Sequence, residues 1–168
     1  MEEPRDNHQV IIIFMQAYRA LIKLFSTFFY VGYLPLPGTA ASIAGALIFY
    51  FFCGDARLCF FLAFLFIILG FMVAGPAERI FQRKDAQCVV IDEVAGIFIS
   101  LIFIPCDNRL IIIAFILFRI FDVLKPYPIA RLQRLGGSLG IMCDDIIAAI
   151  YTNVVIFIAF RFLPLVVS

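Results

Sequence analysis

The sequence predicts an all-α membrane protein: a polytopic helical bundle of about five short transmembrane helices, preceded by an N-terminal interfacial helix. Hydrophobic residues make up 64% of the 168 residues and charged residues 15%, whereas soluble domains are about 45–50% apolar and about 25% charged. The mean hydropathy is +1.07. The apolar residues also fall into runs of helical length that end at turn-forming residues.

Length and charge narrow the domain organisation and the function. We expect a polar N-terminal tail over residues 1–9 and a single membrane-embedded catalytic domain over residues 10–168. The 13 Lys and Arg residues nearly balance 12 Asp and Glu, for a formal net charge of +1. This balance excludes a nucleic-acid binder that works by bulk charge. None of the five cysteines belongs to a C-x-x-C pair, so we expect neither a disulfide framework nor a zinc site.

The first apolar segment, residues 10–31, carries Arg19 and Lys23. Two cations within an apolar helix favour an amphipathic helix that lies at the membrane interface. A first transmembrane helix is the alternative interpretation. The next run, residues 39–53, is uncharged and ends at a Gly-Asp turn, so it is the first predicted span.

Four further spans follow along the chain. Residues 58–77 carry no charge in 20 positions, and a bilayer core needs about 20 residues of helix. Residues 88–104 end at a turn that begins with Pro105. Residues 110–124 and 146–163 complete the set.

Basic residues are unevenly distributed over the two sides that five alternating spans define. Ten of the 13 Lys and Arg residues fall on the side that holds the N-terminus. The other three are Arg57, Arg109 and Arg161. Because cytoplasmic segments are enriched in Lys and Arg, the first side is predicted to be cytoplasmic.

Four polar stretches fall at the cytoplasmic ends of the predicted spans: residues 34–42, 92–96, 119–128 and 136–145. Ionisable groups at full membrane depth cost about 2.5–3.5 kcal/mol each, so they are functional candidates. We therefore expect five acids to face one another at one membrane surface: Asp92, Glu93, Asp122, Asp144 and Asp145.

These acids supply hard oxygen ligands, which repel one another and take up protons unless a cation is present. Such ligands suit Mg²⁺ bound together with water and a substrate phosphate. Arg119, Asp122 and Lys125 lie on one helix face, where the two cations suit phosphate oxygens. Thr39 lies at a helix start, where backbone N–H groups attract anions. The set predicts phosphoryl chemistry on a lipid headgroup, with the acyl chains left in the bilayer.

Each polar group also has a structural interpretation. Asp144 and Asp145 could cap a last helix that starts at Ile146, and Asp92 and Glu93 could complement a helix dipole. Other catalytic chemistries lack their residues. The only histidine is in the predicted tail, and neither a G-x-S-x-G nor a P-loop motif occurs.

The chain resembles a known family in four blocks that cover about residues 30–150. In order and spacing, they resemble the signature blocks of the phosphatidylglycerophosphatase A family: Pro37-Gly38-Thr39, Asp92-Glu93-x-x-Gly96, Arg119-x-x-Asp122-x-x-Lys125-Pro126-x-Pro128 and Gly140-Ile141-Met142-x-Asp144-Asp145. The resemblance implies a Mg²⁺-dependent hydrolase of the bacterial inner (cytoplasmic) membrane. Its phospholipid substrate would be phosphatidylglycerophosphate, cleaved to phosphatidylglycerol and inorganic phosphate.

The residues and the resemblance agree on the site. Thr39, Arg119 and Lys125 are the expected phosphate contacts. All five acids are the expected metal ligands, and catalysis is expected from Asp92, Glu93, Asp122 and Asp145.

The main alternative is a small ion or metabolite transporter with an acidic site, because charged groups within a membrane also mark transport pathways. A transporter is expected to place them near the midplane of repeated halves. A phosphotransferase that joins an alcohol to an activated lipid, or a subunit with only an assembly role, are further alternatives.

Overall fold

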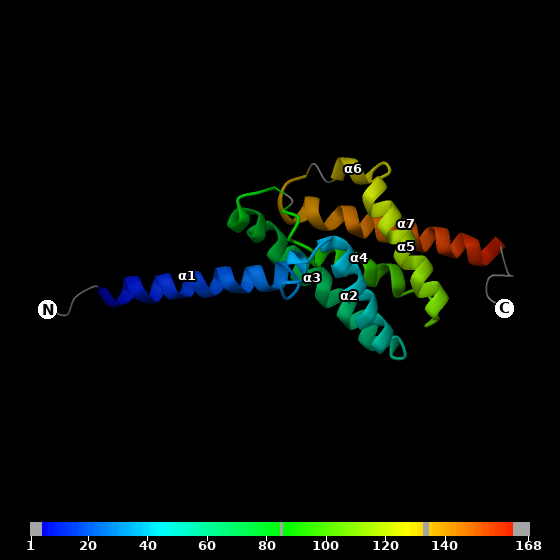
Figure 1. Ribbon diagram of the computed structural model, residues 1–168, viewed down its shortest axis with the longest axis horizontal. Helices are drawn as coiled ribbons and strands as arrows, with labels where there is room; N and C mark the ends of the chain where they lie inside the picture. Colours follow the sequence, from blue (N-terminus) through cyan, green and yellow to red (C-terminus); the bar gives the residue numbers. More distant parts are fainter. Residues whose placement is uncertain (1–4, 85, 133–134, 163–168) are drawn as a thin grey trace.

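The computed structural model describes residues 5–84, 86–132 and 135–162. Within these residues the chain forms α-helices and one 3-10 turn, with no strand (Figure 1), which confirms the predicted all-α class. In chain order the elements are α1 (Arg5–Ser26), η1 (Val31–Tyr33), α2 (Pro37–Phe52), α3 (Ala56–Phe81), α4 (Ile91–Leu101), α5 (Asn108–Leu124), α6 (Ile129–Leu132) and α7 (Gly137–Phe162).

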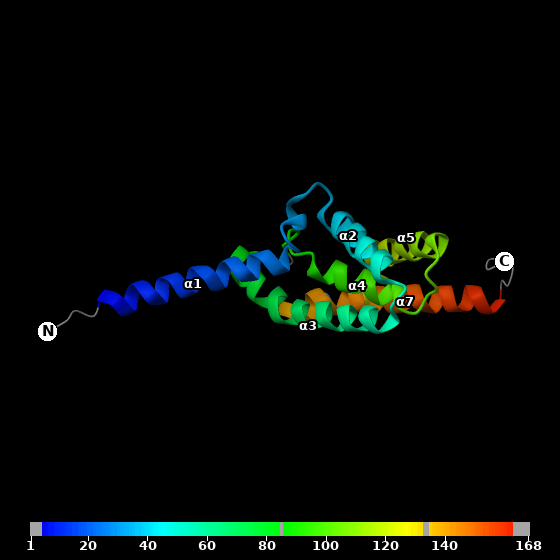
Figure 2. The same ribbon diagram turned by 90° about the horizontal axis from the view of Figure 1, so that it is seen from below.

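Helix α4 is the centre of the body. It packs against α2, α3, α5 and α7, and Figure 2 shows it between the pair α2 and α5 and the pair α3 and α7. The ring of Phe98 on α4 is fully buried, with its centroid 5.7 Å from that of Phe49 and 5.2 Å from that of Phe66. Edge-on aromatic packing of this kind fixes neighbouring helices in one arrangement.

Close approach of α2 to α4 depends on Gly45. A Cβ atom at this position would lie 2.6 Å from the Ile97 side chain. The absence of a side chain therefore lets the middle of α2 lie against α4. The starts of both helices, which carry two of the polar stretches, line the same pocket.

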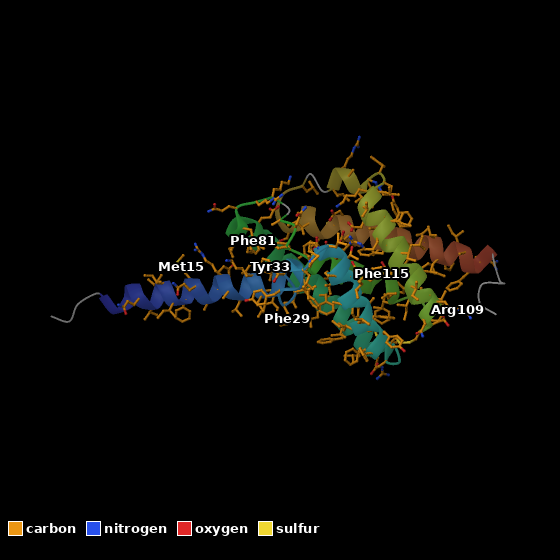
Figure 3. The ribbon with its side chains drawn as sticks, in the orientation of Figure 1. Met15, Phe29, Tyr33, Phe81, Arg109 and Phe115 are labelled. Atoms are coloured by element: carbon orange, nitrogen blue, oxygen red, sulfur yellow. A yellow bond between two sulfur atoms is a disulfide. The ribbon has the colours of Figure 1, made fainter. Side chains whose placement is uncertain are left out.

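Helix α1 extends away from the body (Figure 1). Only its last turns pack, on α3: Ile22 is buried, and the ammonium of Lys23 lies 5.7 Å from the ring centroid of Phe81, which Figure 3 labels. The apolar residues from Val10 to Met15 are exposed. The helix begins at Arg5, so it includes part of the segment predicted as a polar tail.

Three helices in the described residues are long and apolar enough to cross a membrane: Gln9–Ser26, Ala56–Phe81 and Gly137–Arg161. Pro37–Phe52 is apolar but shorter. Helix α4 has 11 residues, so it is about 16 Å long, whereas a hydrocarbon core is about 30 Å thick. The predicted count of about five spans therefore stays a prediction.

The turns at the far ends of α2 and α4 lie side by side. A disulfide joins Cys53 to Cys106, whose Cα atoms are 5.6 Å apart. No disulfide framework was expected from the sequence, and this link was not predicted. Next to these cysteines, Asp55 caps α3 by accepting hydrogen bonds from two backbone N–H groups at 3.0 and 3.2 Å. Asp107 caps α5 in the same way, at 2.9 and 3.1 Å.

The last helix begins nine residues earlier than the predicted span. Its first residue, Gly137, donates its N–H to Glu78 Oε2 at 3.0 Å. Ser138 Oγ accepts a hydrogen bond from the backbone N–H of Gly75 at 2.8 Å. These contacts with α3 stabilise the first turns of α7. The interpretation of Asp144 and Asp145 as helix caps was therefore wrong, because both lie inside the helix.

Candidate active site

A pocket of about 450 Å³ opens where four helices meet. The start of α2, the start of α4, the end of α5 and the first turns of α7 enclose it. Its lining holds all five predicted acids and both predicted cations, together with Leu36, Pro37, Gly38, Gln87 and Val89. The convergence of the polar stretches is thus a feature of the folded chain.

Three of the acids lie close enough to share one ion. One carboxylate oxygen from each of Asp92, Glu93 and Asp145 lies within 4.8 Å of the others. Asp92 is 7% exposed and Asp145 is 2% exposed. Glu93 Oε2 and Asp145 Oδ2 are buried and accept no hydrogen bond from any described residue. Buried carboxylate oxygens of this kind need a cation or a proton, so the donor set fits a hard divalent cation.

The backbone explains why Asp92 and Glu93 point into this pocket. Both lie in the first turn of α4, where their negative charges face the positive end of the helix dipole. The start of α4 is fixed by the N–H of Val90, which donates to the Ser26 carbonyl oxygen at 2.9 Å. Both acids therefore lie where they can complement the helix dipole, and both also line the pocket. The two roles are compatible.

Both cations of the pocket are paired with acids that lie outside the close group of three. Arg119 Nη1 lies 2.7 Å from Asp122 Oδ2. Lys125 Nζ lies 2.5 Å from Asp144 Oδ2 and 3.8 Å from Asp122 Oδ1. Burial lowers the pKa of Lys125, but the hydrogen bond that its ammonium donates to Asp144 and the charges of the nearby acids outweigh burial and raise the pKa overall. The ammonium group therefore stays charged at neutral pH.

Lys125 reaches α7 because α5 stops there. Its backbone adopts the left-handed conformation, with φ of 44°, and its N–H donates to the Phe121 carbonyl oxygen at 2.9 Å. Pro126 follows and cannot continue a helix. Arg119 therefore projects from a face of α5, whereas Lys125 projects from its end. A regular helix that continued past Lys125 would not direct this side chain toward α7.

Gly38 leaves the wall of the pocket open. A Cβ atom at this position would overlap Glu93 Oε1 and would lie 3.3 Å from both terminal nitrogens of Arg119. The glycine therefore allows an acid from α4 and a cation from α5 to approach the start of α2. The Pro-Gly pair at the helix start was recognised from the sequence, but this steric requirement was not.

Gly96 positions the acid on α7. A Cβ atom at Gly96 would lie 2.7 Å from the Phe118 ring and 3.2 Å from the Cβ atom of Asp145. The glycine of the Asp-Glu-x-x-Gly block thus lets α4 lie close to α5 and α7, one turn below Asp92 and Glu93.

The eighth predicted site residue lies outside the pocket. Thr39 is half-buried and lines an apolar groove beside α5, together with Arg119. Sequence reasoning missed Gln87 and Val89, which line the pocket from the segment before α4. The sequence feature that could have indicated their place in the pocket is their position a few residues before Asp92.

Comparison with known proteins identifies relatives over most of the chain. The family model for phosphatidylglycerophosphatase A matches residues 24–160. A phosphatidylglycerophosphatase A from Haemophilus influenzae is 38% identical over 127 residues, which are 73% of this chain and 78% of the relative. The phosphatidylglycerophosphatase A of Escherichia coli K12 is 29% identical over 133 residues, or 77% of each chain.

A third relative carries a different name. A protein from Bacteroides thetaiotaomicron, provisionally named phosphatidylinositol-3-phosphatase, is 32% identical over 145 residues, which are 81% of this chain and 91% of the relative. No solved structure matches the chain. The family match covers every residue that lines the pocket, and the chain belongs to the phosphatidylglycerophosphatase A family.

Proposed function

We propose that the protein is a membrane phosphatase that hydrolyses the terminal phosphate of phosphatidylglycerophosphate to give phosphatidylglycerol and inorganic phosphate. The observation that carries this proposal is the pocket itself, in which five acids and two cations from separate parts of the chain line one space. The substrate is inferred from the family to which the chain belongs. The pocket contains the acidic and basic groups that phosphoryl transfer requires.

We propose that Asp92, Glu93 and Asp145 hold Mg²⁺. Their close oxygens and the buried oxygens of Glu93 and Asp145 that accept no described hydrogen bond support this assignment. When bound, such a metal neutralises phosphate charge and lowers the pKa of a coordinated water.

The protein's own residues would then carry the remaining work. Arg119 and Lys125 bind the phosphoryl oxygens, where negative charge increases during transfer. Asp122 and Asp144 hold the two cations in place through their ion pairs. A carboxylate of the pocket accepts the proton of the attacking water. The oxygen of that water bonds to phosphorus, the ester bond to the glycerol oxygen breaks, and that oxygen takes up the proton that the carboxylate accepted.

An aspartate could instead attack phosphorus directly and form an aspartyl-phosphate that water then hydrolyses. Trapping of labelled phosphate on the protein after a rapid acid quench distinguishes this route. The direct-water route predicts no labelled protein.

We also propose that the pocket faces the cytoplasm of a bacterial inner membrane. Arg57, at the start of α3, and Arg109, at the start of α5, lie at the end of the helical body opposite the pocket, where few basic residues occur. The disulfide between Cys53 and Cys106 lies at that end too. Disulfides persist in oxidising compartments such as the bacterial periplasm, so the disulfide supports the same orientation as the charges.

The test is phosphate release by the detergent-solubilised protein from a panel of phosphomonoesters. The panel contains phosphatidylglycerophosphate, phosphatidylinositol 3-phosphate and glycerol 3-phosphate. We expect the first to be hydrolysed fastest and the soluble ester slowest, because the soluble ester lacks the lipid part that holds the phosphate at the membrane surface. Faster hydrolysis of phosphatidylinositol 3-phosphate would instead favour the activity for which the Bacteroides relative is named. Absence of phosphate release from all three substrates would refute the proposed phosphatase function.

A further inference from the structure

An apolar groove runs between α2 and α5, which lie side by side (Figures 1 and 2). Its first part is a cavity of about 380 Å³ lined by Ile43, Ala46 and Leu47 on α2 and by Ile111, Ile112 and Phe115 on α5. Figure 3 labels Phe115 between the two helices.

The groove continues into a second cavity that reaches the polar pocket. This cavity, of about 520 Å³, shares Phe115 with the first, and its lining includes Thr39 on α2 and Arg119 on α5. Arg119 also lines the polar pocket, as does Gly38, the neighbour of Thr39. The apolar groove therefore leads to the guanidinium group that is proposed to bind phosphate.

The part of the groove that lies between Arg119 and the end away from the pocket matches one leaflet in length. From Thr39 to Tyr50, the outermost α2 residues that line it, the helix advances about 16 Å at 1.5 Å per residue. Half of a hydrocarbon core is about 15 Å. An acyl chain of a lipid whose headgroup lies at Arg119 would therefore be accommodated along the groove.

A second apolar groove provides an internal comparison. It lies beside α4 and α7, has a volume of about 480 Å³, and is lined by residues that include Ile99, Ile150 and Phe157. None of its lining residues lines the polar pocket. Apolar surface is common on this protein, so it is continuity with the polar pocket that singles out the α2–α5 groove.

We propose that the α2–α5 groove binds one acyl chain of the phospholipid substrate and so positions its phosphate in the pocket. This inference rests on the proposed lipid phosphatase function, and it replaces the expectation that both chains stay in the bulk bilayer. Lipid tails are as apolar as the groove, so transfer of a chain from the bilayer contributes little affinity. The gain is orientation: a chain held along α2 and α5 limits the positions that the phosphate can take.

The experiment compares two substitutions of the same kind. Ile112→Trp places a large ring in the α2–α5 groove, and Ile150→Trp places one in the other groove. Both isoleucines are exposed, at 58% and 47%, so neither ring has to enter the core. Phosphate release is measured on phosphatidylglycerophosphate with long chains and on the dihexanoyl form, whose chains are too short to fill the groove.

We expect Ile112→Trp to lower kcat/KM for the long-chain lipid by about tenfold relative to the dihexanoyl form, and Ile150→Trp to leave that ratio within about twofold of the wild-type ratio. Equal ratios for the two variants would overturn the inference while the phosphatase proposal stands. Absence of phosphate release by the wild-type protein from any lipid would instead refute the proposed function.

A second measurement does not depend on turnover. Phosphatidylglycerophosphate that carries a diazirine near the end of one acyl chain is photolysed with the protein in nanodiscs, and the labelled peptides are identified by mass spectrometry. The inference predicts label on α2 and α5 that excess unlabelled lipid displaces. Label spread equally over α2, α5, α4 and α7 would contradict it.

Discussion

The two ends of the helical body use aspartate in different ways. At the pocket, Asp92 and Asp145 are buried and lie within reach of a second carboxylate from another helix. At the opposite end, Asp55 and Asp107 are exposed and accept hydrogen bonds from the backbone of their own helices. Local sequence does not separate these cases, because each aspartate follows or precedes an apolar run. The folded chain separates them through burial and through the partners that other helices bring.

Removal of divalent metal tests the difference between the two ends with the largest expected effect, because only the carboxylates of the pocket are proposed to hold a metal ion. We expect EDTA to abolish phosphate release, because the close carboxylates of the pocket would then lack their counter-charge, and Mg²⁺ to restore it. Thermal unfolding with and without Mg²⁺ provides a second readout. Full activity in EDTA, with no change on Mg²⁺ addition, would contradict a metal site.

The next test compares two glycines, one at each end. Gly38→Ala adds a methyl group that overlaps Glu93 Oε1, whereas Gly54 has nothing within 4 Å of the corresponding position. We expect Gly38→Ala to lower kcat by about 10²-fold, since small displacements of reacting groups are costly, and Gly54→Ala to retain wild-type turnover. Similar turnover in both variants would show that the pocket tolerates the displacement.

Removal of one cation from each end sharpens the comparison. Lys125→Gln removes a charge that pairs with Asp144 and Asp122 in the pocket. Arg109→Gln removes an exposed charge at the opposite end, where Figure 3 labels the residue. We expect Lys125→Gln to reduce kcat/KM by about 10- to 100-fold through lost phosphate binding. Arg109→Gln is expected to match the wild-type protein in the same assay.

The smallest expected effect on turnover comes from the disulfide. Cys53→Ser with Cys106→Ser removes a link that closes a separation of 53 residues, and such links contribute about 2–4 kcal/mol to stability. We expect a lower midpoint of thermal unfolding in detergent and unchanged kcat at 25 °C, because the disulfide lies away from the pocket. A large loss of kcat in folded protein would show that the two ends are coupled.

Much of the fold could be predicted, because apolar runs and turn residues are local features. The predicted spans 39–53 and 110–124 differ by only a few residues from α2 and α5. The convergence of the acids could be predicted as well. In a chain of alternating spans, the polar stretches that carry them all lie at span ends on the same side of the membrane. The start of α7 could not, because Gly136 and Gly137 are typical of a loop and the helix there is held by Gly75 and Glu78 on α3.

Other features depend on distances between segments that are remote in sequence. The pairing of Cys53 with Cys106 requires two turns to meet. The role of Gly38 depends on the approach of Glu93 and Arg119, and the α2–α5 groove depends on how two helices pack. No periodicity or motif in the sequence contains this information.

The most direct test of the central claim compares matched substitutions at the two ends. Asp92→Asn and Asp145→Asn remove charge from the close carboxylates, whereas Asp55→Asn changes an aspartate to a residue that also caps helices well. Phosphate release from phosphatidylglycerophosphate is measured for each folded variant in Mg²⁺. The account predicts losses of about 10²-fold or more for the two pocket variants and none for Asp55→Asn. Wild-type turnover by both Asp92→Asn and Asp145→Asn would contradict it.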